Sequence, residues 1–600
     1  MNLFRFGNLN FNNIIMVQDS SVLNQDEKKV LGHPAGLFVL FFTEMWERFS
    51  FYGMRVLLIQ FLTASVLGAN PGWGWSAEQA GALYGTYAML LYITPIFGGV
   101  IADKYIGSRA AVIIGAAIMT LGHAAMAFDS PAMFFIGLGC LVIGTGFFKP
   151  NMPAILGEMY KGLPDKKDGA YTIFYMGVNA GAFFGMMLCG YLAETIGWHW
   201  GFGLAGIFML LGTIQFWLAG PLLGKLGVLD KKPKEDTEVK SNLEEGEVKH
   251  NNFTLVDIIL MVIVGIVGLV YAFNDPLSKN NVLDVFAFLD TPVLRGQNIM
   301  IIGALVLFLV LIVSRIQRYA KVVRDRMYGV ILLAFFLIFF FMSFEQGATS
   351  LVLVARDYVN RELTGNSLLM FNIVNTLLTI VPLIIISWVL IKLALATWSK
   401  IALSNIILFV CFILIWGAGI WMLYNEFTAE ISEIKVSWFS ILNSFFIISL
   451  ASSVSKIWES KYNPTAAMKY GIGLILVAIG FLILGYGSLG AGQGVKISMI
   501  FLVLTYLFHT LGELFISPVG LSYVSKLVPA RMLAFMFGMW YLAIAIAQKL
   551  AAILGGQVET IQENYSLSHF FFLFTIIPAA AGLLVMVLNP IIKRLMHGIK

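Results

Sequence analysis

Sixteen apolar segments, most of them about 20 residues or longer, follow one another along the chain. A hydrocarbon core about 30 Å thick is crossed by about 20 helical residues, so each segment is long enough to span a membrane. They lie near 36–67, 77–101, 109–128, 131–156, 169–194, 200–222, 254–273, 297–315, 327–357, 366–392, 400–424, 437–457, 468–488, 496–525, 531–555 and 568–592. The sequence therefore predicts an all-α polytopic membrane protein with about 16 transmembrane helices.

Composition supports this fold class. Charged residues make up 12% of the 600 residues and apolar residues 59%, whereas a soluble protein carries about 25% charged residues. This excludes soluble enzymes, secreted disulfide scaffolds and nucleic-acid binders. Cys140, Cys189 and Cys411 each lie in an apolar stretch, which is typical of small core residues. We therefore expect no metal site, no cofactor and no nucleic-acid partner.

Basic residues gather in the loops after every second span. The eight clusters are Lys104 with Arg109, Lys161 with Lys166 and Lys167, Lys225 to Lys249, Arg315 to Arg326, Lys392 with Lys400, Lys456 to Lys469, Lys526 with Arg531, and Lys593 to Lys600. Cytoplasmic loops carry an excess of Lys and Arg. The alternation predicts that both termini are cytoplasmic, and residues 1–30 lack the pattern of a signal peptide.

The polar stretch 223–253 separates six spans from the rest, as in a transporter built from two helical bundles. The predicted parts are a cytoplasmic N-terminal segment (1–35), a six-helix bundle (36–222), a cytoplasmic linker with two additional helices (223–326), the first helix of the second bundle (327–357), an inserted helix pair with flanking loops (358–436) and the remainder of the second bundle (437–600).

The first span carries Glu44, Glu47, Arg48 and Arg55, with Tyr52 between them. At the helical period these five residues fall within an arc of roughly 140°. Charged residues in hydrocarbon are costly and usually mark a function. Glu44 and Arg48 are four residues apart and can neutralise each other. The stripe predicts a cavity-lining face; the alternative is an internal salt bridge that only fixes helix packing.

Three further charges lie in or near apolar spans, namely Lys149, Glu345 and Glu513. Each is also compatible with a charge at a helix end that reaches the membrane surface. A carboxylate beside a cation stays ionised, whereas a desolvated, unpaired carboxylate takes up a proton. Opposed charges in a closing cavity can therefore link protonation to conformation, so the pattern favours proton coupling.

Four motifs resemble those of the proton-dependent oligopeptide transporters, a branch of the major facilitator superfamily, and a fifth, from Gly99 to Arg109, resembles the superfamily's cytoplasmic loop between helices two and three. They are Thr43-Glu44-Met-Trp-Glu47-Arg48-Phe-Ser-Phe-Tyr52-Gly53-Met-Arg55, Gly99-Val-Ile-Ala-Asp103-Lys104-Tyr-Ile-Gly107-Ser-Arg109, Phe147-Phe-Lys149-Pro150-Asn151, Phe174-Tyr-Met-Gly-Val-Asn179-Ala-Gly181 and Gly512-Glu513 through Gly520-Leu-Ser522. The resemblance extends from about residue 36 to 550. It implies a bacterial cytoplasmic-membrane protein that acts as a monomer and imports di- and tripeptides with protons.

The resemblance also implies residue roles. The peptide carboxylate would meet Arg55 and Lys149, and the peptide amine would meet Glu513 with Asn179 and Asn443. The hydroxyls of Tyr52 and Tyr92 would bond the ligand, and Ser517 lies in the same motif as Glu513. Protonation would involve Glu345, which pairs with Arg55 as an outer gate, together with the cluster Glu44, Glu47 and Arg48.

The chain departs from the family at three places. Ile441-Leu-Asn443-Ser444 stands where the family usually has Ser-Leu-Asn-Pro, and Phe341 replaces a tryptophan. The pair 366–392 and 400–424 is inserted between the seventh and eighth helices, in addition to the extra pair that bacterial members commonly carry. His509 either modulates Glu513 or is an interior hydrogen-bonded histidine.

Two other functions remain open. The same fold could carry nitrate, an amino-acid derivative or a peptide-like drug, although Glu513 favours a substrate with an amine. A membrane-embedded enzyme or receptor is the third possibility. No H-E-x-x-H, paired-aspartate or G-x-S-x-G pattern occurs in a plausible setting, which argues against an enzyme.

Overall fold

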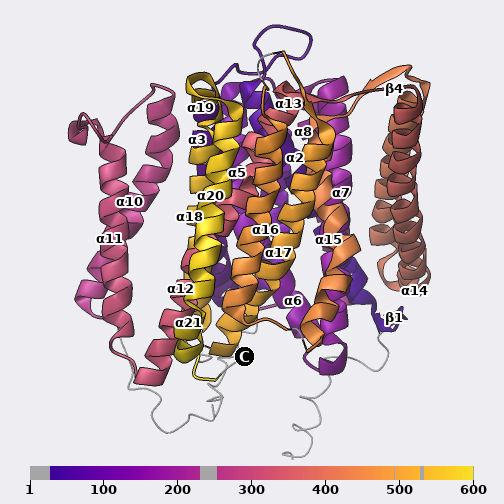
Figure 1. Cartoon of the computed structure of the whole chain (residues 1–600). Helices are drawn as coiled ribbons and strands as arrows, with labels where there is room; N and C mark the ends of the chain where they lie inside the picture. Colours follow the sequence, from indigo (N-terminus) through magenta and orange to yellow (C-terminus); the bar gives the residue numbers. More distant parts are fainter. Residues whose placement is uncertain (1–27, 230–252, 462, 492–493, 528–532, 599–600) are drawn as a thin grey trace, which may run out of the picture.

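A computed structural model describes residues 28–229, 253–461, 463–491, 494–527 and 533–598. Two bundles of helices stand side by side, and a helical hairpin lies at each flank (Figure 1). Residues 1–27 of the predicted N-terminal segment and residues 230–252 of the predicted linker lie outside the described residues. The described chain has the two bundles and the two inserted helix pairs that the sequence predicted.

The first bundle contains six long helices: α2 (Ala35–Thr63), α3 (Ala77–Ile101), α4 (Ser108–Met126), α5 (Pro131–Phe148), α7 (Pro164–Thr195) and α8 (Trp198–Leu218). The π-helix η1 (Ala102–Ile106) extends α3, and the short α6 (Asn151–Met159) and α9 (Gly220–Leu223) follow α5 and α8. The predicted span 131–156 is thus interrupted at Lys149 and Pro150, because proline lacks the amide hydrogen that would continue the helix.

The second bundle contains α12 (Lys321–Phe344), α15 (Val436–Glu459), α16 (Ala466–Gly487), α17 (Met499–Leu527), α18 (Leu533–Gly555) and α20 (Leu567–Val587). The 3-10 turn η3 (Glu345–Ala348) and α13 (Ser350–Asp357) complete the predicted span 327–357, and α19 (Val558–Asn564) and α21 (Asn589–Leu595) flank α20. The helical path therefore changes at Glu345, one of the predicted site residues.

Two hairpins flank the bundles. The first consists of α10 (Leu255–Lys279), the 3-10 turn η2 (Ala287–Leu289) and α11 (Gly296–Ile316). The second is α14 (Gly365–Thr428), in which Ile401 breaks the helical backbone with φ −138° and ψ 46°. Its ends meet where β4 (Glu362–Thr364) pairs antiparallel with β5 (Ile431–Glu433), so its two halves run in opposite directions.

The α14 hairpin packs on the first bundle although its sequence interrupts the second. Ser404 Oγ donates to Gln215 O of α8 at 2.9 Å, and the Phe412 ring lies edge-on to Phe42 of α2 with centroids 5.8 Å apart. It also contacts α7. The order of the sequence therefore does not determine which bundle the hairpin covers.

Fourteen helices of the described chain are long and apolar enough to cross a membrane. Helix α2 is not among them because it carries four charged residues, and α14 is counted once although it makes two crossings. With α2 and both halves of α14, the described residues contain the sixteen predicted spans. The remaining short strands are β1 (Lys29–Val30) with β2 (His33–Pro34), and β3 (Val359–Asn360) with β6 (Ile497–Ser498).

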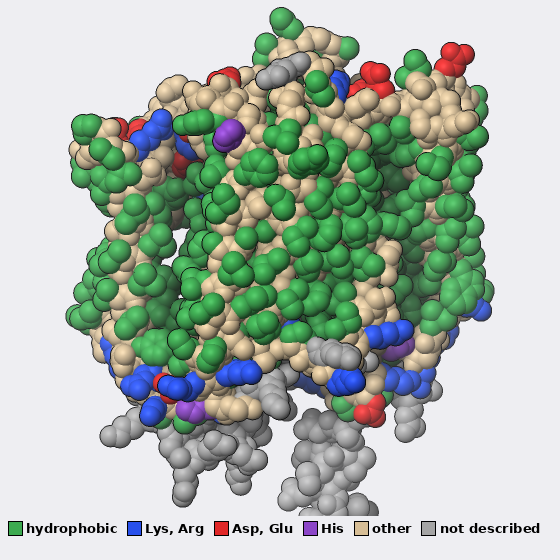
Figure 2. Space-filling view, in the orientation of Figure 1, with side chains coloured by type: hydrophobic (Ala, Val, Ile, Leu, Met, Phe, Trp, Pro, Cys, Tyr) green, Lys and Arg blue, Asp and Glu red, His purple; other side chains and the backbone are tan. Residues whose placement is uncertain are grey.

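The two ends of the molecule differ in charge (Figure 2). We call one the basic end, where α21, the start of α12 and the end of α11 bring Lys and Arg together, and the opposite one the acidic end, which carries the β4–β5 pair and α19. On the face that Figure 2 shows, apolar side chains cover most of the surface between them. The described chain begins and ends at the basic end (Figure 1), consistent with an even number of spans.

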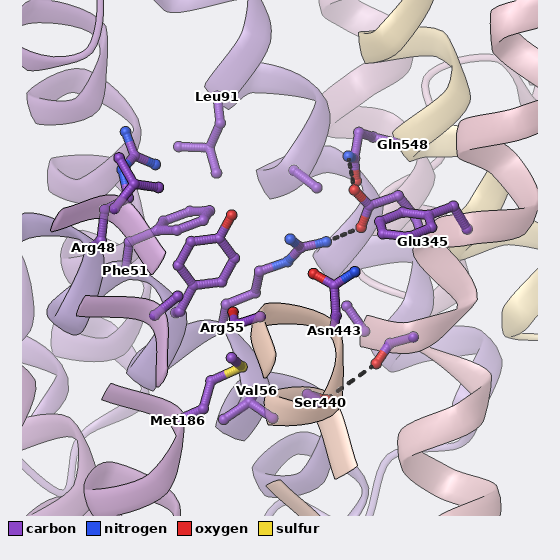
Figure 3. A pocket seen from close by; sticks show the side chains of 18 of the residues that line it. Arg48, Phe51, Arg55, Val56, Leu91, Met186, Glu345, Ser440, Asn443 and Gln548 are labelled. Carbon is purple, nitrogen blue, oxygen red and sulfur yellow. Dashed lines mark hydrogen bonds and ion pairs between the residues drawn. The ribbon is translucent and has the colours of Figure 1, made fainter. Parts of the chain in front are cut away.

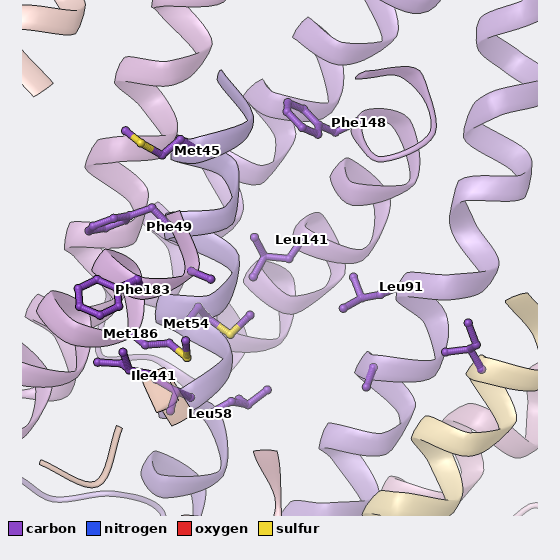
Figure 4. Close-up of a cluster of buried hydrophobic side chains, with 14 of the residues drawn as sticks. Met45, Phe49, Met54, Leu58, Leu91, Leu141, Phe148, Phe183, Met186 and Ile441 are labelled. Carbon is purple, nitrogen blue, oxygen red and sulfur yellow. The ribbon is translucent and has the colours of Figure 1, made fainter. Parts of the chain in front are cut away.

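Close helix packing explains how the first bundle is held. An added Cβ at Gly144 of α5 would lie 2.6 Å from the carbonyl oxygen of Gly115 in α4. Helices in lipid associate through such close contacts, since lipid tails are as apolar as the side chains. Figure 4 shows Phe49, Met54 and Leu58 along α2, with Met186 of α7 close by; all four are buried. This packing fixes α2, which carries the charged stripe.

Candidate functional site: a charged cavity between the bundles

A cavity of about 460 Å³ lies between the two bundles, within the size range of small-molecule sites. Helices α2, α3, α5 and α7 of the first bundle and α12, α15, α17 and α18 of the second supply its walls. The predicted site residues that line it are Glu44, Arg48, Tyr52, Arg55, Tyr92, Lys149, Asn179, Glu345, Asn443 and Glu513. The structure therefore brings ten of the twelve predicted residues together.

Glu47 and Ser517 do not line the cavity. Glu47 is fully buried, and its Oε2 lies 2.9 Å from Arg48 Nε. The same nitrogen is 2.8 Å from Glu44 Oε1. Arg48 thus joins one carboxylate in the cavity wall to one behind it. Ser517 Oγ is buried and has no hydrogen-bond partner among the described residues.

Arg55 extends across the cavity toward the second bundle (Figure 3). Its Nε donates to the Tyr84 hydroxyl at 2.7 Å, and its Nη2 forms an ion pair with Glu345 Oε2. Gln548 Nε2 donates to the other carboxylate oxygen, Oε1, at 2.7 Å. This chain of contacts closes the space between α2 of the first bundle and η3 and α18 of the second.

Lys149 lies where α5 is interrupted, and its ammonium is 4.1 Å from the centre of the Tyr92 ring. Within the described part of the chain the structure gives Lys149 no ion pair. A cation over an aromatic face gains roughly 0.5–2 kcal/mol, less than a buried ion pair with good geometry provides. The ammonium is therefore free to meet an anion in the cavity.

Glu513 lies in the wall formed by the second bundle. Asn443 Nδ2 donates to its Oε2 at 2.9 Å, and the same amide lies 3.2 Å from Thr510 Oγ1. On the first bundle, Asn179 Nδ2 donates to the Tyr175 carbonyl at 3.0 Å. The amide oxygen of Asn179 can therefore accept a hydrogen bond from a ligand.

Apart from Glu44, which pairs with Arg48 on the same helix, the charged residues of the cavity wall divide between the bundles. Arg48, Arg55 and Lys149 come from the first bundle, and Glu345 and Glu513 come from the second. A ligand with an anionic and a cationic end can therefore bridge the two bundles through charge-assisted hydrogen bonds. The same division makes closure of the cavity sensitive to whether a carboxylate carries a proton.

Several lining residues were not predicted from the sequence. Tyr84 and Gln548 both contact the Arg55–Glu345 pair, and both stand in apolar helices without a recognisable motif. His509 also reaches the wall but is 2% exposed, and its Nε2 has no partner among the described residues. Phe341 and Ser444, at two of the predicted family departures, line the cavity as well.

Comparison with known families matches the chain to the POT family model over residues 109–422 and 399–571. The chain belongs to the POT family. It is 30% identical over 581 residues to the peptide transporter YePEPT of Yersinia enterocolitica, covering 94% of this chain and 96% of that protein. It is 27% identical over 583 residues to a di-/tripeptide transporter of Lactococcus lactis subsp. cremoris, covering 96% and 99%.

The fold comparison agrees with the family. A crystal structure of a mutant peptide transporter POT in complex with alafosfalin superposes with a TM-score of 0.69 at 28% identity, covering 95% of this chain and 98% of that one. The POT fold therefore extends over almost all of this chain.

Proposed function

We propose that the protein is a proton-coupled symporter that imports di- and tripeptides by alternating access. The observation that carries this proposal is the division of charge across the cavity, with Arg55 and Lys149 facing Glu345 and Glu513. A zwitterionic peptide presents a carboxylate and an amine a few bonds apart. A site that binds these termini tolerates varied side chains, which the apolar parts of the wall can accept.

In the proposed binding mode the peptide carboxylate meets Arg55 and Lys149. The amine meets Glu513, whose orientation is fixed by Asn443, and Asn179 accepts a further hydrogen bond. Tyr52 and Tyr92 supply hydroxyls from the first bundle. The names of the relatives support this substrate class, since two are peptide transporters and one solved structure holds alafosfalin.

Cross-bundle hydrogen bonds support a state closed at the acidic end. Ala77 N donates to Glu559 Oε2 at 2.9 Å, and Arg356 Nη1 donates to Thr63 Oγ1 at 2.7 Å. Val436 N donates to Glu194 Oε2 at 3.1 Å. If the acidic end is extracellular, as the positive-inside rule predicts, this state binds or releases substrate on the cytoplasmic side.

Protonation provides the coupling. A proton on Glu345 neutralises the carboxylate that Arg55 binds, so the ion pair loses its charge attraction and the two bundles can separate at the acidic end. A peptide carboxylate then replaces Glu345 as the partner of Arg55. The buried residue Glu47 supplies a second carboxylate, whose protonation would leave Arg48 paired with Glu44 alone.

Uptake of a dipeptide panel into proteoliposomes tests the proposal. With an inward proton gradient we expect accumulation above the external concentration, and a proton ionophore should reduce it to equilibration. Accumulation that the ionophore leaves unchanged would exclude proton coupling.

A non-peptide substrate is the alternative, because Phe341 and Ser444 alter the cavity wall at two positions where the family differs. Excess dialanine should compete with labelled substrate if peptides are carried. A carrier of nitrate or another non-peptide should be insensitive to it.

A further inference from the structure

Lys549 lies at a junction of three separate parts of the fold. Its ammonium donates to the Ala82 carbonyl at 3.0 Å and to Thr86 Oγ1 at 2.9 Å, both on α3. It also lies 2.5 Å from Asp275 Oδ2 on α10. Lys549 is 4% exposed and Asp275 1%. One buried cation of the second bundle therefore binds both the first bundle and the flanking hairpin.

The hairpin is attached to α3 by contacts that do not involve Lys549. Thr86 Oγ1 donates to the Ala272 carbonyl at 2.6 Å, and Lys279 Nζ lies 3.3 Å from Glu78 Oε1. Gln79 Nε2 donates to the Lys279 carbonyl at 3.4 Å. If α3 separates from α18, these contacts keep α10 attached to α3. The contacts that must then break are those of Lys549 with Ala82, Thr86 and Asp275.

Asp275 has partners of its own within the hairpin. Gln297 Nε2 of α11 donates to Asp275 Oδ1 at 3.2 Å, and Lys279 Nζ lies 3.6 Å from the same oxygen. The carboxylate of Asp275 therefore keeps a hydrogen bond from Gln297 and a nearby cation, Lys279, when Lys549 moves away. Once α3 and α18 separate, water would fill the space between them and solvate the ammonium of Lys549. Exposing this charge would then carry no desolvation cost.

The neighbouring residue connects this junction to the gate. Gln548 donates to Glu345, which binds Arg55, and Lys549 follows it on the same turn of α18. Movement of α18 away from α3 therefore acts on the Arg55–Glu345 pair and on the Lys549–Asp275 pair together.

We propose that Lys549 and Asp275 form a releasable lock through which the α10–α11 hairpin holds the seam between α3 and α18 closed. This inference rests on the proposed alternating access. It gives the hairpin a part in the transport cycle: loss of the lock shifts the protein toward a state open at the acidic end.

Distances between spin labels can test the lock. Cys140, Cys189 and Cys411 are replaced by alanine, and single cysteines are placed at Leu67 and Tyr565, which are 81% and 74% exposed and belong to opposite bundles. Double electron–electron resonance then gives the ratio of open to closed molecules in the full-length protein. It is measured across pH, with and without dialanine.

We expect Lys549→Met and Asp275→Asn each to raise the open-to-closed ratio roughly tenfold, within the range of coupling between linked sites. Exchanging the two charges, Lys549→Asp with Asp275→Lys, should return the ratio toward that of the unmodified protein. Arg318→Gln is the matched control, because among the described residues every side-chain hydrogen bond and ion pair given for Arg318 is with Asp257 of α10, the closest at 2.7 Å.

Unchanged ratios in both single variants would overturn the lock, and so would an equal shift in Arg318→Gln. Should a single variant fail to fold, the uncharged pair Lys549→Met with Asp275→Leu leaves neither charge unpaired and must still show the shift. If the unmodified protein never opens under any condition, the alternating-access proposal fails. If it opens and the variants match it, only the lock fails.

Discussion

Gln548 Nε2 donates to Glu345 Oε1 at 2.7 Å, on the oxygen that Arg55 leaves free. The gate carboxylate thus has both oxygens occupied, one by a residue of each bundle. Gln548 therefore holds the carboxylate that Arg55 binds, and any change at Gln548 acts on this contact between the bundles.

Replacing Gln548 by leucine should change the pH dependence of uptake. Without the amide donor, one oxygen of Glu345 loses its hydrogen bond to α18, so the pH profile of gradient-driven uptake should move away from that of the unmodified protein. Initial uptake rates measured across external pH would show this shift. An unmoved profile with only a lower maximal rate would mean that Gln548 has a packing role alone.

Glu47→Gln should abolish gradient-driven accumulation while exchange of labelled for unlabelled peptide survives. Glu47 is fully buried and does not line the cavity, so its loss should spare the binding site. Both assays use the same proteoliposomes, which makes exchange the internal control. Undiminished accumulation would remove Glu47 from the coupling mechanism.

Glu513→Gln should weaken binding of peptides with a free amine. Truncating one partner of a buried charge pair costs about 2 kcal/mol or more, which corresponds to a rise in KM of roughly thirtyfold. An N-acetylated dipeptide lacks the cationic amine, so its weaker competition should change little in this variant. Equal losses for both ligands would indicate a general disturbance of the site.

Gly144→Val should destabilise the first bundle, because the new side chain would meet the Gly115 carbonyl of α4. Overpacking of this kind costs roughly 1–3 kcal/mol, so the thermal unfolding temperature in detergent should fall. Gly139→Val on the same helix is the control, since an added Cβ there meets nothing within 4 Å. Equal melting temperatures for the two variants would contradict the packing argument.

The sequence predicted the membrane spans well because hydrophobic length is a local property. Their ends were less accurate. The span predicted to end at residue 273 continues as α10 to Lys279, and its polar last turn is stabilised by Lys549 and Gln297, which lie far away in the sequence. Asp275 therefore lies beyond the predicted span 254–273.

The candidate site was predicted largely through motifs, and the structure brings most of those residues to one cavity. Gln548 and Tyr84 were missed because one polar residue in an apolar helix leaves no pattern of its own. Lys549 could have been noticed, since a charge inside the span 531–555 meets the criterion that identified Glu345. Its partner Asp275 could not be recognised in the same way, because it lies beyond the predicted span 254–273.

The position of the α14 hairpin on the first bundle determines where the chain can be cut to make a functional chimera. Its two connections, near β4 and β5, leave the second half of the chain, but its buried face rests on α2, α7 and α8. A chimera that exchanges the halves of two relatives at the central linker would transplant this hairpin onto a foreign first bundle. Such a hybrid should function only when residues such as Phe42 and Gln215 travel with the hairpin they contact.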